Sequence, residues 1–155
     1  MSNPYGYSEQ YMHGQNDLRW SWRKLTPYAK TMKEVGCVLT SLSYIISRND
    51  KKDLLPGSFL DWIAQKAKDA KYKDYMTTDG RVYWNAVDRF TGETLVNCGS
   101  AEKKYTLVEV YWGPLRHWMV ELKGGLVFNP YGYKVEPLKQ PKWYPTGRKQ
   151  YYKAT

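Results

Sequence analysis

The spacing of apolar residues changes partway along the chain, and this change limits the folds that the sequence can adopt. Val38, Leu42, Ile45 and Ile46 follow the period of an amphipathic helix. After residue 105 the chain instead carries short runs of β-branched and aromatic residues separated by glycines, as strands and turns do. Helices followed by strands predict an α+β domain.

A second helix is indicated after Pro56. Ser58 and Asp61 have the spacing of a capping box, so we expect this helix to begin with Ser58 as its N-cap. Its apolar positions predict a buried face made of Leu60, Ile63, Ala67 and Ala70. The stretch beyond it has a turn at Asp79-Gly80, and residues 81–90 fit either a short strand or a helical turn.

Three strands are expected at residues 106–112, 116–122 and 126–129. Gly113-Pro114 and Gly124-Gly125 separate them, which predicts an antiparallel meander. The chain of 155 residues is long enough for one core. We divide it into a polar arm (1–14), a folded domain (15–136) and a basic, tyrosine-rich tail (137–155).

The cysteine and histidine counts exclude several classes of protein. Two cysteines cannot form a disulfide framework or a four-thiolate zinc site, and two histidines without metal-ligand spacing predict neither a metal nor a cofactor. No signal peptide and no apolar run long enough to span a bilayer is evident. We therefore expect the chain to be cytoplasmic or incorporated in a larger particle.

Three residues have the contexts that a thiol catalyst needs. Cys37 follows Gly36 at the predicted start of a helix, where unpaired N–H groups favour the thiolate. A thiolate nucleophile also needs a base, and the base needs an orienting group. His117 lies in a predicted strand, and Asn129 ends the next strand, so the two can supply those functions.

The turn between these strands decides whether His117 and Asn129 meet. Residues of a strand alternate between faces, so an even register is required. A two-residue loop at Gly124-Gly125 would place the two side chains on opposite faces. A three-residue loop that pairs Leu122 with Leu126 would place both on one face, and glycine readily adopts the left-handed conformation that such loops use. We predict the three-residue loop.

At these residues the sequence resembles the papain-like cysteine peptidases, and more narrowly the relatives of the bacteriocin leader peptidases. The resemblance rests on QNDLRW at Gln15, GCVLTSLSYI at Cys37, HWMVEL at His117 and FNPYG at Asn129. It implies a papain-like fold in which N-terminal helices pack on a C-terminal antiparallel sheet.

The resemblance also implies a mechanism. Cys37 would be the nucleophile, His117 the general base and acid, and Asn129 the orienter of the imidazole. Gln15 would donate to the oxyanion together with the Cys37 backbone N–H. The expected activity is hydrolysis of a peptide or isopeptide bond, such as one in a cell-wall peptide, through a thioester. An amine could replace water in the second step.

Other readings of the same residues stay open. Cys37 can be a small buried residue of the helix, Cys98 is expected to be structural, and His117 can be a half-buried strand residue. Gln15 can be a loop residue. His13 lies in the polar arm, where we expect it in solvent. The chain would then be a catalytically silent module of the same fold, with a structural or binding role in a phage particle or at a bacterial surface.

The net charge of +9 is concentrated at the C-terminal end. Basic residues of the predicted tail alternate with aromatic ones, as in surfaces that bind an anionic polymer such as nucleic acid or wall polymer. The alternative, to which we give equal weight, is a basic tail that is surrounded by solvent and binds no polymer. The candidate contacts are Lys134, Lys139, Lys142, Arg148, Lys149 and Lys153.

Overall fold

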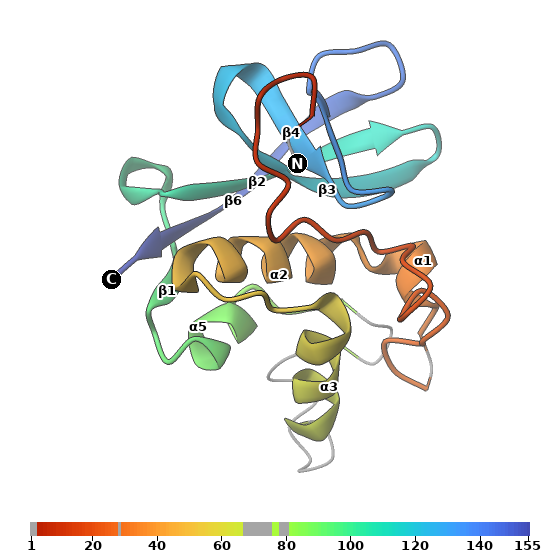
Figure 1. The fold of residues 1–155 in the computed structure, drawn as a ribbon, viewed down its shortest axis with the longest axis vertical. Coiled ribbons are helices and arrows are strands. Elements are labelled where there is room, and N and C mark those ends of the chain that lie inside the picture. Colours follow the sequence, from red (N-terminus) through yellow and green to blue (C-terminus); the bar gives the residue numbers. More distant parts are fainter. Residues whose placement is uncertain (1–2, 28, 67–75, 78–80) are drawn as a thin grey trace.

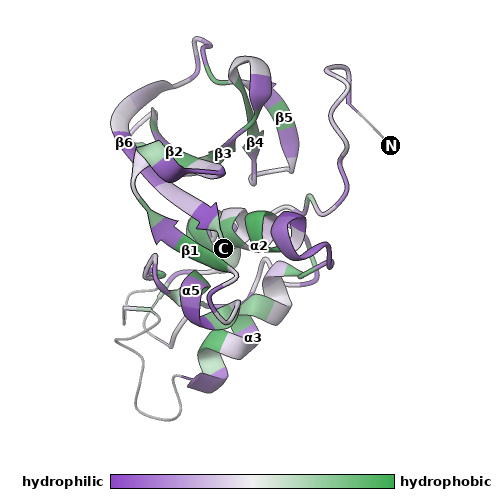
Figure 2. Ribbon diagram, turned by 90° about the vertical axis from the view of Figure 1, so that its left-hand side faces the viewer, coloured by the Kyte–Doolittle hydropathy of each residue, from purple (hydrophilic) through white to green (hydrophobic). Residues whose placement is uncertain are grey.

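Helices and strands occupy different halves of the chain. The computed structural model describes residues 3–27, 29–66, 76–77 and 81–155. Figures 1 and 2 show the helices on one side and the strands on the other, with α2 against the sheet. The α+β class predicted from the sequence is confirmed.

Four α-helices are found within the described residues, namely α1 (Met32–Val35), α2 (Cys37–Asp50), α3 (Pro56–Lys66) and α5 (Ala86–Phe90). α2 begins at Cys37 as predicted, and it continues a turn beyond the predicted stripe to end at a left-handed Lys51. Across the described stretches, no helix combines the length and the apolar character needed to cross a membrane.

The predicted start of α3 at Ser58 is wrong by two residues. The helix begins at Pro56, because proline at the first helical position has the required φ and needs no N–H partner there. Asp61 binds Arg23 at 2.6 Å, so it does not complete a capping box.

Leu60 and Ile63 are buried in α3 as predicted, whereas Ala67 and Ala70 lie outside the described residues. The predicted turn at Asp79-Gly80 also lies outside them. Of the two alternatives for residues 81–90, the helical one holds for Ala86–Phe90.

Six strands form one antiparallel sheet within the described residues. They are β1 (Leu95–Cys98), β2 (Tyr105–Trp112), β3 (Leu115–Glu121), β4 (Leu126–Asn129), β5 (Lys134–Pro137) and β6 (Tyr144–Ala154). The order across the sheet is β1-β6-β2-β3-β4-β5. Two short 3₁₀ turns, η2 (Ser100–Glu102) and η3 (Lys123–Gly125), connect strands. The predicted meander of β2, β3 and β4 is confirmed.

The segment predicted as a C-terminal tail is part of the sheet. β6 lies between β1 and β2 and pairs with both. Tyr152 is fully buried, and its hydroxyl donates to the Trp84 carbonyl at 2.6 Å. The tyrosines and basic residues assigned to a tail are therefore residues of a strand, with Tyr152 in the core and Arg148 and Lys149 exposed.

The sheet carries a separate cluster of apolar side chains on each face. Leu107, Trp118 and Phe128 belong to the large core that includes α2. Val110 and Met119 belong to the smaller cluster. Because strand residues alternate between faces, the side chain of each residue of β3 is assigned to one cluster or the other.

The turn between β3 and β4 has the predicted length of three residues. Val120 pairs with Phe128, and the Leu122 N–H donates to the Leu126 carbonyl at 2.8 Å. Gly124 and Gly125 have φ values of 72° and 74°, which glycine adopts without steric cost. The even register that places residues 117 and 129 on one face is thereby confirmed.

Gly36 joins α1 to α2 at a point where a side chain has no room. A Cβ on Gly36 would lie 2.4 Å from the Met32 carbonyl oxygen, which belongs to the backbone and cannot move aside easily. The start of α2 at Cys37 therefore depends on glycine at position 36.

We expect Gly36→Ala to lower the free energy of unfolding by about 2 kcal/mol and the melting temperature by about 4–8 °C. Gly99→Ala is the matched control, since Gly99 has φ of −82° and an added Cβ would meet no atom within 4 Å. Thermal unfolding followed by circular dichroism checks both variants. Equal stability of the two would contradict the packing argument.

Candidate active site

His117 and Asn129 meet on one face of the sheet. His117 lies near the start of β3, and Asn129 is the last residue of β4. Both side chains are buried, and His117 Nε2 lies 2.8 Å from Asn129 Oδ1. The pair follows directly from the register of the β3–β4 turn.

The surroundings of Asn129 fix which of its amide atoms faces the imidazole. Asn129 Nδ2 donates to Glu136 Oε2 at 2.8 Å, and Asn129 Oδ1 accepts the Tyr131 backbone N–H at 2.9 Å. The oxygen therefore faces His117, so a neutral imidazole must carry its proton on Nε2. Nδ1 then holds a lone pair, and within the described residues it makes no hydrogen bond.

Glu136 is itself held by Lys142, whose Nζ lies 2.6 Å from Glu136 Oε1. Burial acts to raise the pKa of Glu136, but its hydrogen bonds with Lys142 and Asn129 outweigh burial and lower that pKa. Lys142 also lies over the rings of Trp112 and Trp143, at 5.2 and 4.5 Å from their centroids. An ionised carboxylate anchored at both oxygens thus keeps the Asn129 amide in one orientation.

Burial strongly disfavours the charged form of His117. It lowers the pKa of His117 from 6.5 to about 4, although the hydrogen bond to Asn129 and the Glu136 charge act in the opposite direction. The edge of Trp112 contacts the imidazole, with ring centroids 5.2 Å apart. At neutral pH His117 is therefore a neutral base shielded from water.

Cys37 is the first residue of α2 and is only 9 % exposed. We predicted that the helix N-terminus would favour its thiolate, but burial raises the pKa of the Cys37 thiol above its ordinary value. Backbone N–H groups of Trp118 and Val38 act to lower it and are outweighed. The prediction failed because the helix start faces the core, where removal from water costs more than the helix dipole supplies.

The structure places Cys37 against the strand that carries His117. Within the described residues, the ladder between β3 and β4 begins at Val120, so the part of β3 before it is not paired with β4. The backbone N–H of Trp118, in that part, lies against the Cys37 thiol. The Trp118 side chain packs in the core with α2. Because neighbouring residues of a strand point to opposite faces, the His117 side chain lies on the other face of the sheet. Across the described part of the chain, no hydrogen bond joins the thiol to the imidazole.

Gln15 connects the loop before α1 with the turn after Asn129. Its backbone N–H donates to the Pro130 carbonyl at 2.8 Å, and its side-chain Nε2 donates to the Lys33 carbonyl at 2.9 Å. The side chain is 2 % exposed, and its Oε1 makes no hydrogen bond with the described residues. Gln15 thus joins α1 to the residue that follows Asn129, and its amide also lies 3.5 Å from the Met32 carbonyl of α1.

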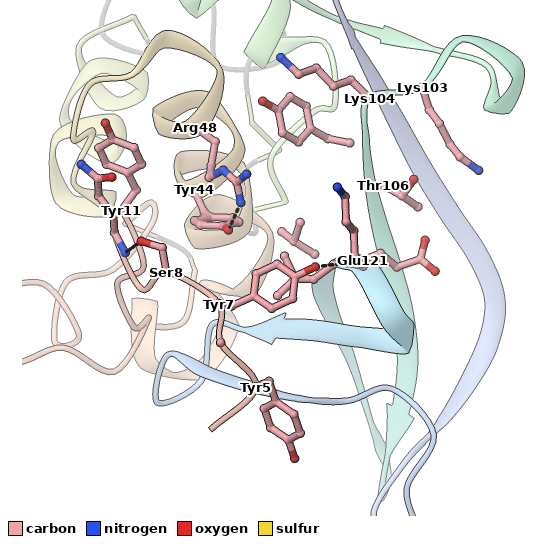
Figure 3. Close-up of a pocket in the computed structure, with 16 residues that line it drawn as sticks. Tyr5, Tyr7, Ser8, Tyr11, Tyr44, Arg48, Lys103, Lys104, Thr106 and Glu121 are labelled. Carbon is pink, nitrogen blue, oxygen red and sulfur yellow. Dashed lines mark hydrogen bonds between the residues drawn. The ribbon is translucent and has the colours of Figure 1, made fainter. Parts of the chain in front are cut away.

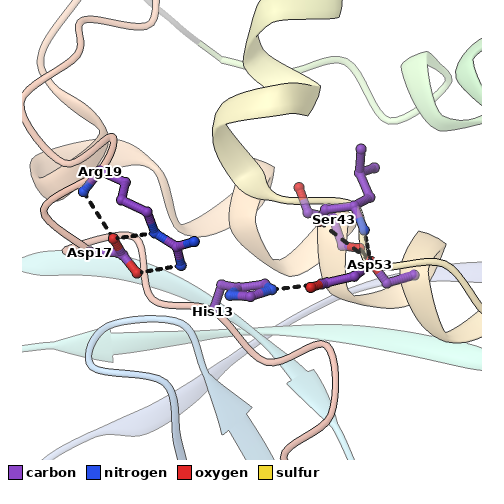
Figure 4. A network of polar contacts seen from close by, with 7 residues as sticks. His13, Asp17, Arg19, Ser43 and Asp53 are labelled. Carbon is purple, nitrogen blue, oxygen red and sulfur yellow. Dashed lines mark hydrogen bonds and ion pairs between the residues drawn. The ribbon is translucent and has the colours of Figure 1, made fainter.

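His13 does not take part in this arrangement. Its Nε2 lies 2.7 Å from Asp53 Oδ1, as Figure 4 shows, and its ring contacts Trp20 edge-on. The expectation that His13 lies free in solvent is therefore wrong. The arm residue packs against the body of the protein because Trp20 and Asp53 together supply an apolar and a charged partner.

Other candidate residues lie elsewhere. Cys98 ends β1 at an intermediate exposure. A search of the described residues finds no group of three or more His, Cys, Asp or Glu side chains that could hold a metal ion.

No protein-family model matches the sequence, and neither a curated protein nor a solved structure matches the chain with significance.

Sequence reasoning missed Glu136 as a partner of Asn129, and it assigned Lys142 to an anionic polymer and not to this carboxylate. One signal could have found Glu136, the single acidic residue after position 123. The pairing of Asn129 with Lys134 places Glu136 opposite Val127 and on the face of Asn129. That register was not evident from the sequence, because the turn over residues 130–133 has no residue pattern that fixes its length.

We expect the stability of the protein to fall as pH falls from about 6.5 to about 4. In this window the unfolded chain binds a proton at His117 that the folded chain excludes, so folding becomes less favourable by up to about 3 kcal/mol. Urea unfolding at a series of pH values measures this.

His117→Gln keeps an N–H donor for Asn129 and cannot titrate, so its unfolding free energy should vary less across the same window. His13→Gln is the matched control and should keep the wild-type dependence. A wild-type profile no steeper than that of His117→Gln would refute the buried neutral imidazole.

Removal of the Glu136 carboxylate should change which ring nitrogen of the neutral His117 carries the proton. We expect ¹⁵N NMR to show the Nε2–H form of His117 in the wild type and a detectable fraction of the Nδ1–H form in Glu136→Ala, because only the Tyr131 N–H then opposes rotation of the Asn129 amide. Glu102→Ala is the control, since Glu102 also binds a lysine, Lys153, at 2.7 Å but lies on the surface. An unchanged tautomer in Glu136→Ala would contradict the role of the carboxylate.

Proposed function

We propose that the chain is a papain-like cysteine peptidase that hydrolyses a peptide or isopeptide bond through a thioester at Cys37. The observation that carries the proposal is the 2.8 Å contact between His117 Nε2 and Asn129 Oδ1, in an amide orientation that leaves Nδ1 as an acceptor. A cysteine at the start of a helix, packed on the same strand, supplies the nucleophile.

The order and placement of the elements support this proposal. A helix that begins with cysteine packs on an antiparallel sheet, and two consecutive strands later in the chain, β3 and β4, supply histidine and then asparagine. The same chain order and the same supporting elements are implied by the resemblance to papain-like peptidases. We extend the α+β assignment to the papain-like fold on this basis.

The chemistry would proceed in two halves. As Cys37 Sγ attacks the substrate carbonyl carbon, the thiol proton passes to His117 Nδ1. The carbon–nitrogen bond then breaks, and the imidazolium returns that proton to the leaving amine. Water attacks the thioester and gives a proton to Nδ1, and the acid product leaves as Sγ recovers the proton. An amine in place of water would give acyl transfer.

Stabilisation of the oxyanion would come from two N–H donors. The Cys37 backbone N–H lies at the start of α2, where the first N–H groups have no partner within the helix. The side-chain amide of Gln15 is the other candidate. It donates to the Lys33 carbonyl at 2.9 Å and to the Met32 carbonyl at 3.5 Å, and the longer of these two contacts would be exchanged for the oxyanion. Preorganised donors of this kind supply a large part of the rate enhancement in acyl transfer.

The proposal requires the thiol and the imidazole to approach each other when substrate binds. Cys37 Sγ lies by the Trp118 backbone, and His117 is the adjacent residue of β3. Catalytic hydrogen bonds are often long or misaligned without substrate and shorten in the bound complex. A substrate strand along the part of β3 that β4 leaves unpaired would lie next to both groups.

A catalytically silent module of the same fold is the second candidate. Burial of the thiol, its raised pKa and the lack of a thiol–imidazole hydrogen bond favour it. Nucleic-acid binding by the C-terminal basic residues is disfavoured, because ion pairs join Lys142 to Glu136, Lys149 to Glu121 and Lys153 to Glu102.

Alkylation of the two cysteines separates the first two candidates. We expect a glycyl-glycine chloromethyl ketone at pH 7 to label Cys37 at least about tenfold faster than Cys98, because the peptide backbone brings the electrophile to the nucleophile. Mass spectrometry of digested protein measures both rates in one sample. His117→Ala should lower the Cys37 rate to that of Cys98.

The matched control is His13→Ala, which removes the other histidine and should leave the preference for Cys37 intact. Iodoacetamide, which has no peptide backbone, should discriminate less between the two thiols. Equal labelling of Cys37 and Cys98 by the peptide reagent would overturn the peptidase proposal in favour of the silent module.

A further inference from the structure

A hollow lies at the end of α2 away from Cys37. It is an open cavity of about 830 Å³ between the N-terminal arm, the last turns of α2 and the ends of β2 and β3 (Figure 3). We call it the cationic cavity. Its basic lining residues are Arg48, Lys103, Lys104 and Lys123, and its tyrosines are Tyr5, Tyr7, Tyr11, Tyr44 and Tyr105.

The positive charge of this cavity is not neutralised by ion pairs. Within the described residues, none of its four basic side chains pairs with a carboxylate, and its one acidic lining residue, Glu121, pairs with Lys149. By contrast, Arg23, Lys142 and Lys153, which lie outside the cavity, each bind an acidic partner. Uncompensated charge in a concave site attracts anions.

Arg48 is placed to bind an anion at the wall of the cavity. Its Nη1 donates to the Tyr44 hydroxyl at 2.8 Å, which holds the guanidinium on α2 and leaves its other N–H groups without a partner among the described residues. Figure 3 shows Arg48 beside Tyr44, with Tyr7 of the arm nearby. A planar guanidinium with several unused donors suits two oxygens of a phosphate.

The tyrosines of the cavity suit a planar ring. Tyr7 and Tyr105 are partly exposed, and Tyr5 is 49 % exposed. Lys104 Nζ lies 5.4 Å from the Tyr105 ring, so charge and aromatic surface are adjacent. Nucleic-acid bases stack on such rings while cationic side chains bind the phosphates. The volume lies in the range of small-molecule sites.

We propose that the cationic cavity binds a nucleotide, with its phosphates at Arg48 and Lys104 and its base against the tyrosines. The site lies eleven residues along α2 from Cys37, a distance of about 16 Å. Nucleotide binding is therefore a separate property that does not depend on the proposed peptidase activity. A carboxylate such as Glu121 gives the cavity an acceptor for sugar or base N–H and O–H groups.

Calorimetric titration of the full chain in metal-free buffer tests this proposal. The probes are adenosine triphosphate, inorganic triphosphate and adenosine. We expect the nucleotide to bind, inorganic triphosphate to bind more weakly, and adenosine to bind least, because phosphate supplies most of the attraction and the base adds stacking. Higher salt should weaken the binding of both anions.

The variant pair Arg48→Gln/Lys104→Gln should raise the Kd for the nucleotide by about tenfold or more, since it removes two charged hydrogen-bond donors. Lys24→Gln/Lys30→Gln is the matched control: both lysines are exposed and outside the cavity, and the loss of net charge is the same. Circular dichroism would verify that both pairs fold.

Four outcomes would overturn the proposal. If the nucleotide gave no heat of binding at millimolar concentration, the site would not exist. If both variant pairs weakened binding equally, the net charge of the chain, and not this cavity, would account for the binding. Inorganic triphosphate binding as tightly as the nucleotide would remove the role of the tyrosines. The last outcome is that an eight-nucleotide single strand binds more tightly than the free nucleotide and loses that binding only in the Arg48/Lys104 variant. The ligand would then be a nucleic-acid strand, and the site for a free nucleotide would be overturned.

Discussion

The three-residue turn between β3 and β4 is the constraint on which the candidate site depends. Its even register places His117 and Asn129 on one face, and a shift by one residue would separate them. The turn is possible because Gly124 and Gly125 occupy left-handed conformations. Two glycines that would take no part in the chemistry thus decide whether the buried His117 has a hydrogen-bond partner.

Burial acts in opposite directions on the two groups of the proposed thiol–imidazole pair. It keeps the Cys37 thiol protonated and keeps His117 neutral, because either charge would be formed away from water. A neutral thiol and a neutral imidazole suit a mechanism in which His117 accepts the proton while Cys37 attacks. They do not suit a thiolate–imidazolium ion pair that exists before substrate binds. Glu136 keeps its charge nearby because Lys142 neutralises it, and so fixes the Asn129 amide without charging the imidazole.

The sequence allowed correct predictions where one local signal decides the structure. Gly36 marks the start of α2, and the glycines of the β3–β4 turn mark its length. The sequence did not indicate that β6 is a strand of the sheet. Its lysines have acidic partners, such as Glu121 for Lys149, and these partners lie far away in the sequence. The anchoring of Asn129 by Glu136 was missed for the same reason, since it depends on a register between strands.

The position of β6 has a consequence for the order in which the sheet can assemble. Among the described strands, β1 hydrogen-bonds only to β6, and Leu95 pairs with Ala154 across a long stretch of chain. β1 therefore has no neighbour until β6 has docked on β2, whereas the β2–β3 and β3–β4 hairpins need only their own turns. Local hairpins form faster than such distant pairings, so the half of the sheet that carries His117 and Asn129 is expected to form first, with closure by β6 as the slow step of folding.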